Sequence, residues 1–203
     1  MNLFILGATG GIGTAVLEQA LQRSHSVTAF VRSPEKMTRR DRNLRVQKGD
    51  PHQVDQLANS MVNHGAVISA LGTRSLAKRT LLEDCAKSTI EAMRRNGMRR
   101  LLVVSAALLF PDLGLGATLL RFILHNPMID SQAMEAIVSG SELDWTIARP
   151  PRLTDQKHTG RFRVEEGQLP RNGSSISRAD VAHFLLQAVE DGRYVRTIAG
   201  VCY

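Results

Sequence analysis

Residues 3–13 read Leu-Phe-Ile-Leu-Gly-Ala-Thr-Gly-Gly-Ile-Gly, an apolar run that passes into a glycine-rich turn. Gly7 supplies the backbone angles that a tight turn after a strand needs, and Gly10 leaves space for a ligand beside the main chain. Gly13 allows a helix to pack closely on the strand. The stretch therefore predicts a strand, a turn and the start of a helix.

The start of this helix is a candidate site for a phosphate group. Its free N–H groups and the positive end of the helix dipole attract anions. Glycine spacing alone is weak evidence. Here, however, an apolar run precedes the turn, and apolar residues follow it at helical spacing, namely Ala15, Val16, Leu17, Ala20 and Leu21. We therefore interpret the turn as the pyrophosphate site of a dinucleotide cofactor.

A chain of 203 residues, 43% of them apolar, is long enough for one α/β domain and too short for two. We expect a single domain over residues 1–203. The first predicted strand begins almost at the first residue, which leaves no room for a signal or transit peptide, and the longest uncharged apolar stretch, 101–110, is too short to cross a bilayer. These features predict a cytoplasmic protein with no membrane partner.

The net charge of +7 comes from basic residues that are densest at 32–48 and 94–100. With 4% aromatic residues and no basic stripe interleaved with aromatics, the pattern does not predict nucleic-acid binding. It indicates a solvated basic face or the attraction of an anionic cofactor and substrate. The two cysteines and six histidines show no metal-ligand spacing, so we expect reduced thiols and no metal site.

The end of the second predicted strand, 26–31, carries information about the cofactor. An NAD-preferring domain of this type usually places an acidic residue there to bind the ribose 2′-hydroxyl, whereas this chain has Arg32, followed by Ser33 and Lys36. A guanidinium and an ammonium group suit a 2′-phosphate. We therefore expect NADP(H) to be preferred over NAD(H). The alternative is that Arg32 is only a surface residue at a strand end.

Asp50 and Pro51 follow a third predicted strand, 44–48, and precede a predicted helix over 54–61. At the carboxyl end of a parallel strand, the carboxylate of Asp50 can accept a hydrogen bond from an adenine amino group. Asp before Pro is also an ordinary way to open a turn, so both interpretations stay open.

The fourth predicted strand, 66–70, ends in Leu71, Gly72, Thr73 and Arg74. In open parallel sheets the ligand lies beyond the carboxyl ends of the strands. We therefore expect these residues beside the middle of the cofactor, with Arg74 able to reach a phosphate.

The second half of the chain continues the alternation. We expect a helix over about 76–95, a strand over 100–107 that carries Ser105 near its exit, a helix over 130–139, a strand over 143–148, a short strand over 160–164, and a helix after a capping box at 177–180. Alternating strands and helices with no internal repeat predict an α/β fold with one doubly wound parallel sheet.

Two segments are expected on the substrate side, 108–130 and 150–176. The first is apolar but broken by proline and glycine, and we expect a loop and short helix there that cover the nicotinamide end, lined by Leu108, Leu109, Phe110, Leu120 and Phe122. A packed core helix over 117–125 is the alternative. The second opens with Arg149-Pro150-Pro151-Arg152, a rigid exit from a strand.

Several motifs together resemble a known family. They are Gly-Ala-Thr-Gly-Gly-Ile-Gly, Val-Arg-Ser, Ser-Ala-Leu-Gly-Thr-Arg, Leu-Asp-Trp-Thr-Ile-Ala-Arg-Pro-Pro and Ile-Ser-Arg-Ala-Asp-Val-Ala-His-Phe-Leu. The chain resembles, over nearly its whole length, the atypical short-chain dehydrogenases with an NAD(P)-binding Rossmann fold. Leu-Gly-Thr-Arg and Pro-Pro-Arg-Leu-Thr-Asp-Gln are similar to the narrower family of biliverdin-IXβ reductase, also called NADPH-dependent flavin reductase.

The resemblance implies a role for particular residues. It implies that the cofactor is contacted by Gly7, Thr9, Gly10, Gly11, Ile12, Arg32, Ser33, Lys36, Asp50, Pro51, Leu71, Gly72, Thr73, Arg74, Val104, Pro151, Arg152 and Leu153. Ser105 and Arg152 are the candidates for a role at the reacting end. The chain departs from the family at Ala106, where a second hydroxyl is usual, and at Arg152, where a histidine is common.

The tyrosines exclude one mechanism. Typical short-chain dehydrogenases protonate a carbonyl with a Tyr whose pKa is lowered by a Lys four residues later, and neither Tyr194 nor Tyr203 has that lysine. We therefore expect hydride transfer to an acceptor that takes its proton from water, either an oxidised flavin or a linear tetrapyrrole. The expected contacts of this acceptor are Leu108, Phe110, Arg121 and Arg152, although Arg121 is equally explained as a surface residue.

The main alternative is a non-catalytic sensor of the NADP redox state, similar to the NmrA-type regulators, which also lack the Tyr-Lys pair. A sugar-nucleotide epimerase ranks last because such enzymes usually need that pair and a larger substrate domain. No extra interface helix is evident, so we expect a monomer.

Overall fold

The computed structural model describes residues 1–72, 77, 80–111 and 120–203. A sheet of eight strands forms its centre, in the order β3-β2-β1-β4-β5-β6-β10-β8. All neighbours in this sheet pair in parallel except β8, which is antiparallel to β10. The strands are β1 (Asn2–Leu6), β2 (Ser26–Val31), β3 (Leu44–Lys48), β4 (Ala66–Ser69), β5 (Arg100–Val104), β6 (Asp144–Arg149), β8 (Arg163–Glu166) and β10 (Thr197–Cys202).

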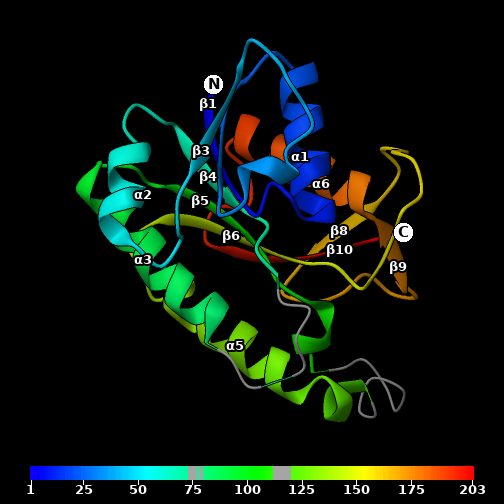
Figure 1. The fold of residues 1–203 in the computed structure, drawn as a ribbon. Helices are drawn as coiled ribbons and strands as arrows, with labels where there is room; N and C mark the ends of the chain where they lie inside the picture. Colours follow the sequence, from blue (N-terminus) through cyan, green and yellow to red (C-terminus); the bar gives the residue numbers. More distant parts are fainter. Residues whose placement is uncertain (73–76, 78–79, 112–119) are drawn as a thin grey trace.

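Helices cover both faces of this sheet (Figure 1). One face carries α1 (Gly11–Gln22) and α6 (Arg178–Glu190). The other carries α2 (Val54–Ser60), α3 (Leu81–Arg95) and α5 (His125–Ser139). Two short 3-10 helices, η1 (Pro34–Lys36) and η2 (Ala107–Leu109), follow β2 and β5. The prediction of an α/β fold with a doubly wound, mostly parallel sheet is therefore confirmed.

Burial on both faces explains the continuous apolar runs of the central strands. In β1, Leu3 and Ile5 enter the core beneath α1 and α6, while Phe4 and Leu6 enter the core beneath α2 and α3. All four side chains are buried, which is typical of a strand in a parallel sheet covered on both sides.

Several predicted boundaries were wrong. β5 ends at Val104 rather than at 107. One more backbone hydrogen bond to β6 follows the strand, because Ser105 N–H donates to Ala148 O at 2.8 Å. The helix expected from about 76 begins at Leu81, and the helix expected at 130 begins at His125. Asp130 explains the later start of α3, because its buried carboxylate accepts from the N–H groups of Leu82 and Glu83.

Three strands were not predicted. β10 lies inside the main sheet, and β7 (Arg152–Thr154) pairs in parallel with β9 (Ser175–Ser177) in a sheet of two strands. The short strand expected at 160–164 lies at 163–166. In the described part of the chain, none of the helices is both long and apolar enough to cross a bilayer.

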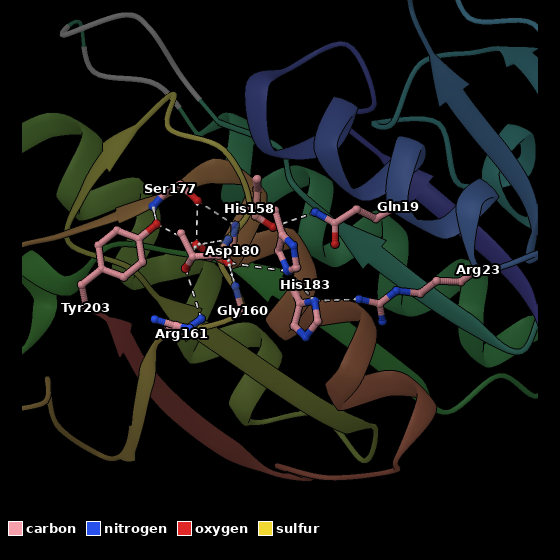
Figure 2. A network of polar contacts seen from close by, with 11 residues as sticks. Gln19, Arg23, His158, Gly160, Arg161, Ser177, Asp180, His183 and Tyr203 are labelled. Carbon is pink, nitrogen blue, oxygen red and sulfur yellow. Dashed lines mark hydrogen bonds and ion pairs between the residues drawn. The ribbon is translucent and has the colours of Figure 1, made fainter.

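A buried carboxylate, that of Asp180, fixes the loop after β7 to the start of α6 (Figure 2). It accepts from Gly160 N at 2.8 Å, from the hydroxyl of Thr159 at 2.9 Å and from the hydroxyl of Tyr203 at 2.6 Å. The predicted cap is present in part, because Ser177 Oγ accepts from Asp180 N at 2.9 Å. The Ser177 N–H donates to Tyr203 rather than to the carboxylate.

These donors decide the ionisation of Asp180. Burial alone would raise the pKa of this carboxyl, but the hydrogen bonds from Tyr203, Gly160 and Thr159 outweigh it and lower the pKa from 3.8 to about 2. Because the pKa is lower in the folded state, the resulting stabilisation is complete above pH 3.8 and is lost as the pH falls toward 2.

We predict that Asp180→Asn lowers the free energy of unfolding by about 3 kcal/mol at pH 7, because an amide cannot accept from all of these donors. Urea unfolding measures the loss, and the gap from wild type should narrow as the pH falls from 3.8 toward 2. Asp191→Asn, at the exposed C-cap of the same helix, is the control and should change stability by less than about 0.5 kcal/mol. An equal effect of the two substitutions contradicts the role given to Asp180.

Candidate functional site

The glycine turn between β1 and α1 is shaped by close approach of the backbone. Gly7 has φ +77°, and a Cβ there would lie 2.5 Å from Ala70 O at the end of β4. A Cβ on Gly13 would lie 2.0 Å from Gly7 O. A side chain at Gly7 or Gly13 would therefore overlap the protein's own backbone, so the fold of the turn needs glycine at both positions, as the sequence predicts. A Cβ on Gly10 would lie 3.3 Å from Gly7 O, so this position is less crowded.

The first turn of α1 can bind an anion through its backbone. Gly10 is the N-cap, no side chain caps the helix, and the first turn holds no acidic residue. The side chain of Ile12 is buried in the core, so only its N–H group can face a ligand. Thr9 is exposed beside it. This arrangement provides the N–H groups and positive dipole that a phosphate needs.

Arg178 is a neighbour of this turn that the sequence interpretation missed. A Cβ on Gly11 would lie 2.5 Å from the Cδ atom of Arg178, so the arginine lies across the start of α1. Its guanidinium donates to Asp155 at 2.6 Å. Arg178 lies in the Ser-Arg-Ala-Asp motif at the start of α6, but nothing in the sequence places this motif beside the first glycine turn.

The exit of β2 brings cationic side chains together. Arg32 and Lys48 line a cleft of about 650 Å³ whose remaining lining includes Asp50 and polar residues of α2. Lys36 is exposed at the end of η1. Glu35 lies among these cations: hydrogen bonds from its own backbone N–H and from Ser33, with the charges of Lys36 and Lys48, lower its pKa. The sequence interpretation gave Glu35 no role.

Asp50 opens a turn, which is one of the two roles that the sequence left open for it. Its backbone O accepts from Gln53 N at 2.9 Å, and its Oδ1 accepts from His52 N at 3.1 Å and pairs with His52 Nδ1 at 2.7 Å. These bonds from His52 lower the pKa of Asp50. Its Oδ2 has no hydrogen-bond or ion-pair partner in the part of the chain that the structure describes, so the turn leaves one oxygen for a ligand. Pro51 is buried behind it.

Leu71 and Gly72 lie at the same edge of the sheet, just after β4. Leu71 packs against the core beneath α3, and Gly72 is exposed with open space where a Cβ would be. The predicted contacts Thr73 and Arg74 lie outside the described residues.

The exits of β5 and β6 are joined by the backbone. In addition to the bond from Ser105 N, Ala107 N–H donates to Pro150 O at 2.9 Å. The hydroxyl of Ser105 is buried and has no hydrogen-bond partner among the described residues. A buried hydroxyl without a partner is costly, and a ligand at this edge would satisfy it. Val104 and Leu153 are half-buried nearby in the core beneath α1 and α6.

Arg152 and Pro151 follow β6 on the way into β7. Arg152 is exposed, and no described side chain pairs with its guanidinium, which leaves it free to meet an anionic group. Pro151 is half-buried.

Two of the predicted substrate contacts have other roles in the structure. Phe110 is 3% exposed, with the Arg149 guanidinium 4.6 Å above its ring. The guanidinium of Arg121 donates to the backbone oxygens of Leu108, Phe110 and Pro111. We therefore assign both residues to holding the loop after β5, and their contact with a substrate stays a prediction. Leu108 remains half-buried and is still a candidate.

The two tyrosines are half-buried and contact other side chains of the protein. The Tyr203 hydroxyl donates to Asp180, and the Tyr194 ring packs against Phe184 with ring centroids 5.2 Å apart. Among the described residues, no cluster of three His, Cys, Asp or Glu side chains could hold a metal ion.

Comparison with known proteins identifies the family. The model of the NAD(P)H-binding family matches residues 7–192. The chain therefore belongs to this NAD(P)-binding family of Rossmann fold.

Individual proteins are similar to this chain over 94% or more of its length. YwnB of Bacillus subtilis, a protein described as uncharacterised, is 26% identical over 202 residues, which cover 94% of this chain and 92% of YwnB. The structure of ChuY from Escherichia coli O157:H7, described as an anaerobilin reductase, has a TM-score of 0.83, 21% identity and coverage of 100% of this chain and 97% of ChuY. The oxidoreductase ylbE of Lactococcus lactis has a TM-score of 0.83 with 20% identity, over 100% of this chain and 90% of ylbE.

We predict that Gly7→Ala destabilises the protein by about 2 kcal/mol more than Gly97→Ala does, as measured by urea unfolding. Both glycines have positive φ, +77° and +63°, but only at Gly7 would the added Cβ meet other backbone, that of Ala70 just after β4. Gly97→Ala therefore controls for backbone strain alone. Equal losses would mean that the approach of Ala70 O does not constrain the turn.

Proposed function

We propose that this protein is an NADPH-dependent oxidoreductase that transfers a hydride to a planar conjugated acceptor, either an oxidised flavin or a linear tetrapyrrole. The observation that carries the choice of acceptor is the position of the two tyrosines. The Tyr203 hydroxyl donates to Asp180, and Tyr194 precedes β10 at the amino edge of the parallel strands, opposite the glycine turn, so neither phenol is placed to protonate an acceptor at the carboxyl edge. An extended conjugated acceptor delocalises the incoming charge and takes its proton from water.

The residues at the carboxyl edge of the sheet fit a dinucleotide. The uncapped N–H groups of α1 would bind the pyrophosphate, with Arg178 as a cation beside Gly11. The contacts proposed for the cofactor are Gly7, Thr9, Gly10, Gly11, Ile12, Arg32, Ser33, Lys36, Asp50, Pro51, Leu71, Gly72, Val104, Pro151, Arg152 and Leu153. When bound, NADPH supplies the hydride.

The chain's own contribution is to bind and orient. Ser105 would offer its unpartnered hydroxyl to the nicotinamide end, at the joined exits of β5 and β6. Leu108 and the backbone around Pro151 would support the acceptor in contact with the nicotinamide, and Arg152 would meet its phosphate or propionate group. In this proposal, 108–130 and 150–176 form the substrate side of one domain. We further propose a monomer that acts in the cytoplasm.

The likeness to ChuY supports a tetrapyrrole acceptor, because that protein is described as an anaerobilin reductase and shares the fold over the whole chain. The test is oxidation of NADPH, followed by absorbance at saturating FMN, riboflavin or biliverdin isomers. We expect turnover with at least one of these acceptors. Tight NADPH binding with no turnover would contradict the proposal and favour an NmrA-type redox sensor.

We predict that Arg32→Asp weakens NADPH binding by roughly a hundredfold and NADH binding by less than about threefold, because a carboxylate would repel the 2′-phosphate. Calorimetric titration with both nucleotides measures the change. Arg42→Asp, an exposed arginine of the same basic segment outside the cleft, is the control and should affect both nucleotides slightly and equally. An equal loss for NADPH and NADH in Arg32→Asp sinks the 2′-phosphate assignment.

A further inference from the structure

The side chains of Asp50 and His52, both in the turn after β3, and of Cys85 in α3 form a connected series of polar contacts. Asp50 Oδ1 lies 2.7 Å from His52 Nδ1, and His52 Nε2 lies 3.7 Å from the Sγ atom of Cys85. Cys85 belongs to α3 and is 2% exposed, whereas the side chain of Asp50 is 47% exposed at the edge of the sheet. This series of contacts therefore connects the protein interior at Cys85 to the predicted adenine site at Asp50.

The carboxylate of Asp50 fixes the direction of these hydrogen bonds, because an ionised carboxylate only accepts and His52 Nδ1, 2.7 Å away, must therefore donate to it. Burial, together with the negative charge of Asp50, raises the pKa of the Cys85 thiol to about 12, so it remains protonated at neutral pH. With the Nδ1 proton held by Asp50, Nε2 of a neutral ring is an acceptor, and the S–H group of Cys85 is the donor that faces it. A neutral imidazole that accepts at Nε2 carries its proton at Nδ1, which donates to Asp50.

The backbone on both sides of His52 is also anchored. Asp50 N donates to Gln56 Oε1 at 2.9 Å, and His52 O accepts from Ser88 Oγ at 3.0 Å. The backbone and the ring of His52 both bind Oδ1, which restricts rotation of the carboxylate, and Oδ2 of this half-exposed side chain has no hydrogen-bond partner among the described residues. A carboxylate held in this way presents one acceptor at a defined position.

We propose that His52 and Cys85 are positioning residues for selection of the nucleotide base: Cys85 orients His52, and His52 holds Asp50 so that its Oδ2 accepts from the exocyclic amino group of a 6-aminopurine. A 6-oxopurine would place a carbonyl oxygen against the same carboxylate and be rejected. This inference rests on the proposed function, because it assigns the adenine end of the same cofactor. Asp50 is the residue that touches the base, and the other two act through it.

The test compares equilibrium binding of NADPH with that of its 6-oxo analogue, nicotinamide hypoxanthine dinucleotide phosphate, by calorimetry without turnover. Wild type should prefer NADPH by roughly tenfold or more, the ratio expected for a hydrogen bond to a charged acceptor. His52→Phe removes the donor to Asp50 and should bring the ratio to about one to threefold. His52→Asn keeps a donor near the position of Nδ1 and should restore much of the preference.

Two substitutions of Cys85 form a matched pair of variants. Cys85→Ser keeps a donor for His52 Nε2 and should keep the ratio, whereas Cys85→Ala removes the donor and should lower it. His64→Phe, at a histidine that contacts Thr28 on another part of the surface, is the control and should bind both nucleotides as wild type does.

A further measurement does not depend on the stability of any variant. The ring nitrogen NMR spectrum of wild-type His52 should show a neutral ring protonated at Nδ1, and a ring protonated at Nε2 overturns the inference. Equal binding of the two nucleotides by wild type, or the same ratio in His52→Phe, also overturns it while leaving the proposed function intact. Wild type that binds neither nucleotide contradicts both.

Discussion

The close approach of three backbone segments at Gly7 is the constraint on which the site depends. The turn after β1 lies against the end of β4, at a distance where no side chain fits, and the start of α1 lies against the same turn through Gly13. This contact sets the uncapped N–H groups of α1 at the edge where the parallel strands end. A shift of this turn would move the anion site relative to Asp50 on one side and Ser105 on the other.

Buried polar groups hold the elements around that edge. Asp130 of α5 accepts from the N-terminus of α3, and Glu135 of the same helix pairs with Arg149 at the end of β6. Asp180 binds the loop after β7 to α6 and to Tyr203, as Figure 2 shows. Since a buried carboxylate that loses its donors is costly, these contacts fix loop positions that apolar packing alone would leave free. Because these carboxylates and the Tyr203 hydroxyl already have partners within the protein, we do not count them as candidate catalytic residues.

The sequence predicts those elements that are encoded by a pattern of neighbouring residues. β2 and β3 lie at the expected residues, because each is a short strand bounded by turn residues. β10 was missed since Gly200 interrupts its apolar pattern, and in the structure Gly200 allows Gln168 O to approach. The positions of Arg178 and His52 depend on contacts between segments far apart in the chain, and no spacing in the sequence encodes them. Arg121 binds backbone oxygens of a nearer segment, the loop after β5, in a fold that the sequence pattern does not reveal either.

The central claim is that the carboxyl edge of the sheet binds NADPH and brings its nicotinamide to Ser105. A crystal structure of the protein with NADP⁺ tests it most directly. We predict the pyrophosphate on the N–H groups at the start of α1, the 2′-phosphate beside Arg32, the adenine on Asp50 and the nicotinamide within hydrogen-bond distance of the Ser105 hydroxyl. A nucleotide bound away from the start of α1, or one whose nicotinamide end points away from the exits of β5 and β6, would contradict the account.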